Sequence, residues 1–303
     1  MLIAALMLSA SAWPPGIVAQ KPGEVLIGAA VLRTIGKKTS MDFFPVAVYR
    51  KGHYVSADSS TGDSPKKGKL AAKTLFTFYR DAHPVGSLSV ESVDTKKTPI
   101  GDFILGHGKW NLLPSAMPRR GEAHSEAEEL LEANMRWDDF GQSDPPYRVV
   151  LGINAKRPAH TGALHVTASE KLKVEKAMQS LIARRAKKAK IDPRKLKLNS
   201  FAAFDVDADG KREYVVDYLG SIDEEETVSI FAIGNLNGTT FVSLYDEPQT
   251  EVYPYAFDAL DIDGNGVQEI VCAQGAMEAG GFMIFSKVHG KFQKVFDELE
   301  FGV

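Results

Sequence analysis

Two stretches of this 303-residue chain resemble each other closely enough to decide how its C-terminal part folds. The first reads SFAAFDVDADGKREYVVD, from Ser200 to Asp217, and the second reads YAFDALDIDGNGVQEIVC, from Tyr255 to Cys272. In each stretch a short apolar run leads into an acidic loop with a glycine, and a β-branched run follows. Such runs, bounded by turn-forming residues, are typical of strands. The sequence therefore predicts two copies of one β unit.

Further strands are expected after each acidic loop. The first copy has apolar or β-branched runs at 214–218, 227–233 and 240–245, and the second at 270–273, 281–287 and 291–296. Each copy, 200–247 and 252–298, is therefore predicted to be a four-stranded antiparallel meander whose first hairpin carries the loop.

The two loops share one pattern of oxygen-bearing side chains. Their first, third, fifth and ninth places are Asp205, Asp207, Asp209 and Glu213 in the first loop, and Asp261, Asp263, Asn265 and Glu269 in the second. Carboxylates that converge on one point repel each other unless a cation lies among them, and calcium prefers 6–8 oxygen ligands. The seventh residues, Lys211 and Val267, would add backbone carbonyls. The pattern predicts structural Ca²⁺, and the alternative is a pair of Asp-rich turns without metal.

The second loop is the stronger candidate of the two. Lys211 and Arg212 can partly neutralise the first loop, whereas the second has no basic residue between its first and ninth places. Neither loop is an EF-hand, because the twelfth places are Val216 and Cys272 instead of a glutamate, and the flanks read as strands.

The spacing resembles the calcium loop of the FG-GAP/VCBS family of β-propeller blade repeats. The resemblance implies that places one, three, five, seven and nine of both loops bind calcium. Two features depart from the family: the ninth residue is Glu where Asp is usual, and only two copies are present. A propeller needs 4–8 blades, so we expect blade-like meanders without a complete propeller.

The N-terminus predicts export. Residues 1–19 contain no charged side chain, and small residues precede Gln20, as at a signal-peptidase site. The apolar run is too short to span a bilayer, and no later segment is long and apolar enough. We therefore predict a signal peptide at 1–19, a secreted or periplasmic location, and no membrane span in the mature chain. A buried N-terminal strand is the alternative.

Residues 20–113 are expected to form a β-rich domain, with strands at 25–32, 45–49, 75–79 and 86–93. The sequence Tyr-Arg-x-x-His occurs at 49–53 and again at 79–83, which indicates two similar hairpins. The glycine-rich stretch at 106–110 is interpreted as a turn with a packed tryptophan.

Residues 114–146 are expected to be a helical connector, whose helix starts at a capping box of Ser125 and Glu128. A C-terminal β domain, 147–303, would follow, with strands at 147–153 and 162–166 and a helix at 169–191. That helix has one apolar stripe, and residues 170–197 hold 11 basic and 3 acidic residues. The basic stretch indicates either a nucleic-acid or membrane-surface patch or a solvated helix face, and the predicted export favours the solvated face and no nucleic acid. The fold class is mainly β with a few helices (α+β).

Composition limits the functions that remain. The net charge of −3 excludes a general polyanion binder, and one cysteine excludes an intrachain disulfide. Catalytic and nucleotide-binding motifs are missing from the sequence. We predict an exported, non-catalytic calcium-binding protein whose β surface binds a protein or a glycan. The alternatives are an envelope hydrolase with structural calcium, which a pocket gathering His107, His160 or His165 with carboxylates would favour, and a structural component of an envelope assembly.

Overall fold

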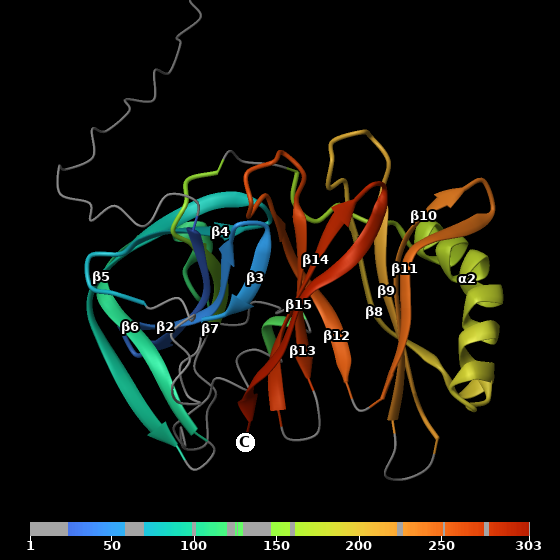
Figure 1. The fold of residues 1–303 in the computed structure, drawn as a ribbon, viewed down its shortest axis with the longest axis horizontal. Coiled ribbons are helices and arrows are strands. Elements are labelled where there is room, and N and C mark those ends of the chain that lie inside the picture. The colour runs from blue at the N-terminus through green and yellow to red at the C-terminus, as the bar shows by residue number, and fades with distance from the viewer. Residues whose placement is uncertain are drawn as a thin grey trace, which may run out of the picture.

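A computed structural model of the chain describes residues 24–57, 70–98, 101–119, 125, 127–129, 147–157, 161–222, 227–250, 252–275 and 279–302. The predicted signal peptide and most of the predicted connector lie outside these residues. The described elements form a row of layers: a barrel, two four-stranded sheets and a helix (Figure 1). The fold is mainly β and antiparallel without a complete propeller, which confirms the predicted class.

The barrel is a sheet that closes on itself. Its strands run in the order β1-β7-β4-β5-β6-β2, β2 pairs with β1 to close the ring, and β3 extends the sheet beyond β2. The bounds are β1 Glu24–Ile35, β2 Lys38–Arg50, β3 His53–Ser56, β4 Leu75–Arg80, β5 His83–Thr98, β6 Gly101–Leu112 and β7 Tyr147–Ile153.

Strand β1 is apolar on both of its faces because each face meets a different core. Leu26, Ala30 and Leu32 point into the barrel interior. Val25 and Ile27, on the other face, belong to a core shared with the C-terminal sheets. A strand buried on both faces has a continuous apolar sequence instead of an alternating one, as β1 does.

The barrel interior is organised around the ring of Phe43. A Cβ added to Gly28 on β1 would lie 2.2 Å from that ring, and one added to Gly152 on β7 would lie 3.0 Å from it. A Cβ added to Gly106 on β6 would lie 3.2 Å from the same ring. The stretch 106–110 therefore forms part of strand β6 and not the turn that the sequence predicted, because its glycines allow close approach of the aromatic ring and the neighbouring strand.

Each C-terminal repeat forms the predicted four-stranded meander. The first sheet has the order β11-β10-β9-β8 and the second has the order β12-β13-β14-β15. The bounds are β8 Lys197–Phe204, β9 Glu213–Ser221, β10 Thr227–Asn237, β11 Thr240–Thr250, β12 Tyr253–Leu260, β13 Glu269–Gly275, β14 Ala279–Val288 and β15 Lys291–Gly302. We call these the first and second C-terminal sheets.

Alternating side chains of the central strands join neighbouring layers. Phe231 of β10 stacks on Phe285 of β14 with ring centroids 5.2 Å apart, in the core between the two C-terminal sheets. Phe282 and Ile284, on the opposite face of β14, join the core shared with the barrel. Ile230, on the opposite face of β10, packs in a core with the helix. Both sheets are thus covered on both faces.

The covering helix is α2, Ala168–Lys188. Its stripe of Val174, Met178, Leu181 and Ile182 is buried, as the sequence predicted. It begins one residue before the predicted start, because the Thr167 hydroxyl caps it by accepting a hydrogen bond from the Glu170 amide at 3.2 Å. Two 3₁₀ turns, η1 Pro114–Ala116 and η2 Pro193–Lys195, complete the described elements.

The structure confirms the predicted pair of hairpins and corrects two strand predictions. The Tyr-Arg-x-x-His stretches form two similar hairpins, in which Arg50 faces His53 and Arg80 faces His83. Strand β7 was assigned by sequence to the C-terminal half, but it hydrogen bonds to β1 and β4 of the barrel. Residues 162–166 form no strand; Leu164 donates one backbone bond to Ala203 at 2.7 Å.

The predicted capping box is present at the start of the connector. Ser125 and Glu128 exchange two hydrogen bonds of 3.2 Å, and residues 127–129 are helical. The rest of that predicted helix lies outside the described residues. Among the described residues, every helix is too short or too polar to cross a lipid bilayer.

We expect Gly28→Ala to lower the free energy of unfolding by about 1–3 kcal/mol, because the new methyl group overlaps both the Phe43 ring and the Phe44 carbonyl. Chemical denaturation measures this loss. Ser89→Thr, which adds a methyl group at an exposed position of β5, is the matched control and should change little. Equal stability of Gly28→Ala and the parent chain would contradict the assigned packing.

Candidate metal centre

The two acidic loops join the first two strands of each C-terminal sheet. Loop 1, residues 205–213, connects β8 to β9, and loop 2, residues 261–269, connects β12 to β13. Each turns through left-handed backbone, at Ala208 and Gly210 in loop 1 and at Gly264 and Gly266 in loop 2. These conformations fold the loops tightly enough for side chains from alternate positions to approach one another.

Loop 2 brings three carboxylates together. One oxygen from each of Asp261, Asp263 and Glu269 lies within 4.8 Å of the other two, and Asp261 and Glu269 are buried. Glu269 is held in place, since its Oε2 accepts from the Ile262 amide at 2.8 Å and its Oε1 accepts from the Ser286 hydroxyl at 3.1 Å. The first, third and ninth places of the predicted site therefore converge.

The fifth and seventh places of loop 2 are engaged in turn hydrogen bonds. The side chain of Asn265 accepts from the Val267 amide at 2.7 Å and donates to Asp263 at 3.0 Å. Asn265 thus orients Asp263, and its own predicted role as a ligand stays a prediction. The role predicted for the carbonyl of Val267 stays a prediction.

The carboxylates of loop 2 are electrostatically strained. Burial, followed by the charge of Asp263, raises the pKa of Glu269 to about 8. Burial also raises the pKa of Asp263. The hydroxyl of Tyr54 on β3 is buried without a hydrogen-bond partner among the described residues, and burial and the charges of Glu269 and Asp263 raise its pKa. A cation among these oxygens would relieve the repulsion.

A guanidinium group fixes the backbone of loop 2. Arg157, which follows β7, donates from Nε to the Asp261 carbonyl at 2.8 Å and from a terminal nitrogen to the Ile262 carbonyl at 2.7 Å. The amide of Arg157 in turn donates to the Tyr79 hydroxyl at 2.8 Å. These contacts hold loop 2 against the barrel, and sequence reasoning missed them because Arg157 is distant in the chain and carries no motif.

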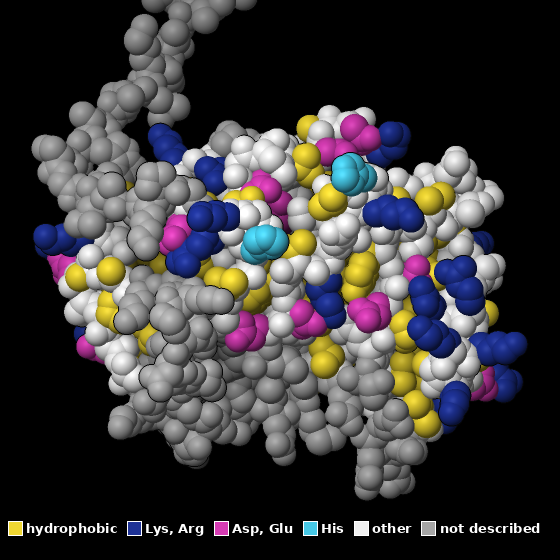
Figure 2. All heavy atoms as spheres, viewed as in Figure 1, with side chains coloured by type: hydrophobic (Ala, Val, Ile, Leu, Met, Phe, Trp, Pro, Cys, Tyr) yellow, Lys and Arg dark blue, Asp and Glu magenta, His cyan; other side chains and the backbone are white. Residues whose placement is uncertain are grey.

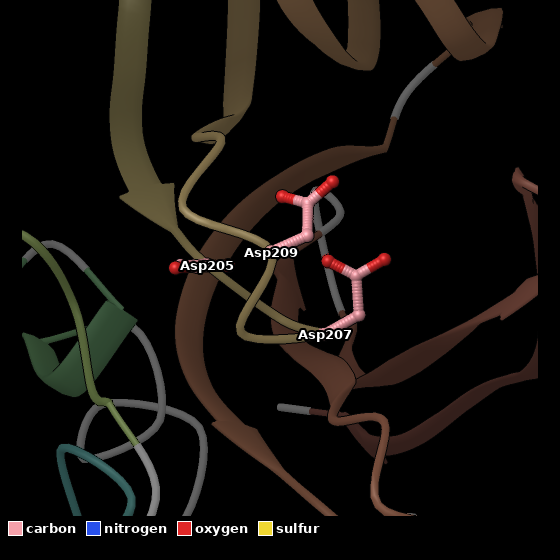
Figure 3. A group of neighbouring side chains, drawn as sticks. All are labelled: Asp205, Asp207 and Asp209. Carbon is pink, nitrogen blue, oxygen red and sulfur yellow. The ribbon is translucent and has the colours of Figure 1, made fainter.

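Loop 1 has the same sequence pattern but a different arrangement. Single oxygens of Asp205, Asp207 and Asp209 lie within 4.8 Å of one another, and the side chains of Asp207 and Asp209 leave the loop on the same side (Figure 3). The ninth residue, Glu213, is not part of this group. It is fully buried, and its Oε2 accepts from the Val206 amide at 3.2 Å.

Two lysines neutralise loop 1. Lys211 pairs with Asp209 at 2.7 Å, as the sequence allowed. The second partner is Lys287 of β14, whose Nζ lies 2.7 Å from Asp207 and 2.7 Å from Glu213. Arg212, the other basic residue in the predicted loop, is bound instead to Glu170 of α2 at 2.8 Å.

The ion pairs and burial act in opposite directions on the pKa values of loop 1. The hydrogen bond from Lys211 lowers the pKa of Asp209. Burial raises the pKa of Glu213 even though Lys287 lowers it. Burial lowers the pKa of Lys287, but Asp207 and Glu213 outweigh it and hold that pKa above its usual range.

An open cleft of about 690 Å³ lies beside loop 1, where the barrel meets the C-terminal sheets. Asp81 and His83 line it from the β4–β5 turn, Gly162 from the following segment, and Asp205 and Gln268 from the two loops. The lining mixes charged and polar side chains with apolar ones such as Val206.

Of the three histidines named for the enzyme alternative, His107 and His165 lie in the described part of the chain. His107 pairs with Asp94 on the barrel at 3.4 Å, the His165 carbonyl accepts from Arg212 at 3.0 Å, and His160 lies outside the described residues. Among the described residues, the histidine that lines the cleft is His83, which the sequence marked only as part of a hairpin.

Basic side chains gather over the end of the molecule where α2 lies (Figure 2). Helix α2 and the segment after it expose Lys171, Lys173, Lys176, Arg184, Lys187, Lys188, Lys190, Arg194, Lys195 and Lys197. The apolar stripe faces the first C-terminal sheet and the charged face is in solvent, as expected for an amphipathic helix.

No known family, no curated protein and no solved structure matches this chain. The likeness to FG-GAP/VCBS repeats therefore stays a prediction, carried by the loop residues and the meanders.

A buried carboxyl group connects the barrel to the second C-terminal sheet. Asp258 of β12 accepts hydrogen bonds from the Ala82 amide at 3.0 Å and the Ala259 amide at 2.8 Å. Ala82 lies in the β4–β5 turn, where both it and Asp81 have left-handed backbone. Burial raises the pKa of Asp258 to about 7, from an ordinary value of 3.8.

We expect Asp258 to make the protein lose stability as pH rises towards 7. Its folded pKa is raised, so the stabilisation is fully present below about pH 4 and is lost as pH rises through about 7. Urea unfolding at pH 5 and pH 8 measures this slope, and Asp258→Asn should reduce it to the part that Glu269 contributes through its own raised pKa. Asp192→Asn, whose carboxyl pKa of about 2 lies below both measurements, is the control. An unchanged slope in Asp258→Asn would refute the assignment.

Proposed function

We propose that this chain is a calcium-stabilised, non-catalytic β module, with its ion in loop 2 and its open cleft as the binding surface for a protein or glycan. The observation that carries the proposal is the convergence of three oxygens from Asp261, Asp263 and Glu269 within 4.8 Å. Hard, negatively charged oxygens are the ligands that calcium prefers. Residues 1–19 predict secretion, which would place the chain where calcium is plentiful.

The donor set of loop 2 fits such an ion. Two of its three carboxylates are buried, and hard, negatively charged oxygens held this close together suit a divalent ion. Burial, followed by the charge of Asp263, raises the pKa of Glu269 to about 8, and a bound cation would favour the charged form. The residues would hold the ion, and the ion would fix the loop between β12 and β13 and its contact with Arg157.

The cleft supports the binding part of the proposal. It is open, has a mixed polar and apolar lining, and is formed by segments from the barrel and from both loops. Calcium that rigidifies loop 2 would also fix Gln268, the residue that loop 2 contributes to the cleft wall. The hydrolase and assembly alternatives remain predictions from the sequence.

Calcium should raise the melting temperature by several degrees relative to chelator, because an ion at one hundred times its Kd adds about 2.7 kcal/mol to the folded state. Differential scanning fluorimetry in calcium and in EGTA measures the effect. Asp261→Asn should abolish it while keeping the bond that Oδ1 accepts from the Gly264 amide at 2.8 Å.

Asp192→Asn, outside both loops, should respond to calcium like the parent chain. Identical melting curves of the parent chain in calcium and in chelator would contradict the proposed function. A full calcium response in Asp261→Asn would contradict the assignment of the ion to loop 2.

A further inference from the structure

The two loops match in sequence but differ in the cation that meets them. In loop 2 the ninth-place carboxylate, Glu269, joins the first and third places. In loop 1 the ninth-place carboxylate, Glu213, is turned to an ammonium group supplied by another sheet. The family pattern that predicts metal in both loops therefore fits loop 2 and does not fit loop 1.

Lys287 occupies the position between the third and ninth places of loop 1. Its Nζ lies 2.7 Å from Asp207 Oδ2 and 2.7 Å from Glu213 Oε1, and its side chain is only 11% exposed. Calcium–oxygen distances are about 2.3–2.6 Å, so an ion bound to these two oxygens would coincide with the ammonium group. The two cations exclude each other.

The oxygens that remain in loop 1 make a poor site while Lys287 is in place. Asp209 is paired with Lys211, and Asp205 Oδ2 accepts from the Gly210 amide at 3.1 Å. Asp205 Oδ1 and Asp207 Oδ1 are buried without a hydrogen-bond partner among the described residues. An ion there would have few anionic ligands and two ammonium groups beside it.

We propose that Lys287 is the built-in cation of loop 1, so that the chain binds one calcium ion and not two. Lys287 lies on β14 of the second C-terminal sheet and loop 1 belongs to the first, so the ammonium group also ties the two sheets together. Calcium then controls only loop 2, on the side of the barrel, and the junction between the two sheets is independent of calcium. The count of one rests on the proposed function, whereas the assignment of loop 1 does not.

Removing the ammonium group should create a second site. Equilibrium dialysis with ⁴⁵Ca²⁺ should give one ion per parent chain and two per Lys287→Met chain. Lys294→Met removes a lysine that pairs with Asp297 and Glu247 outside the loops, and it should keep one ion. The double variant Lys287→Met with Asp261→Asn should bind one, which places the new ion in loop 1.

A second variant tests loop 1 without disturbing Lys287. Asp205→Asn should leave the parent count at one, and Asp261→Asn should reduce it to none. If Lys287→Met folds only in calcium, as circular dichroism would show, the ion has replaced the ammonium group and the proposal is supported.

The outcomes separate the two proposals. A parent chain that binds no ion while Lys287→Met binds one would support the inference and reject the proposed function. A parent chain that binds two ions, a Lys287→Met chain whose count stays at the parent value, or a loss of calcium in Asp205→Asn would each overturn the inference.

Discussion

The fold depends on covering both faces of two apolar sheets. Burying apolar surface contributes about 25 cal/mol per Å², so a blade-like meander with an exposed face would lose much of its stability. Here the barrel covers the second C-terminal sheet, that sheet covers the first, and α2 covers the first from the other side. Two repeats suffice because the barrel and the helix take the places that further blades would have in a propeller.

Buried and partly buried polar groups join these layers to one another. Arg157 joins the segment after β7 to loop 2, Asp258 joins the second C-terminal sheet to the β4–β5 turn, and Lys287 joins the two C-terminal sheets. Apolar contacts alone are tolerant of small shifts, whereas a buried charge or carboxyl group requires its partner at one distance. The layer junctions are therefore also the places where the candidate metal centre and the cleft lie.

The two loops show how one local pattern can reach two electrostatic solutions. Their backbones turn alike, and their ninth-place glutamates are both fully buried and both accept a backbone amide from the second residue of the loop. What differs is the neighbour: loop 1 meets the lysine of an adjacent strand, and loop 2 meets the barrel with Tyr54. The same loop pattern is therefore paired with lysines in loop 1, whereas in loop 2 burial and the charge of Asp263 raise the pKa of Glu269.

The sequence by itself determined the two meanders, their loops, the paired hairpins at 49–53 and 79–83 and the stripe of α2, because strand alternation, turn residues and helical spacing are local. Only the tertiary structure decided that β7 belongs to the barrel, that β1 and β2 close it, and that Lys287 and not Arg212 reaches loop 1. These features depend on which distant strands become neighbours. That choice follows from how apolar faces and buried charges fit together in space, which no local spacing records.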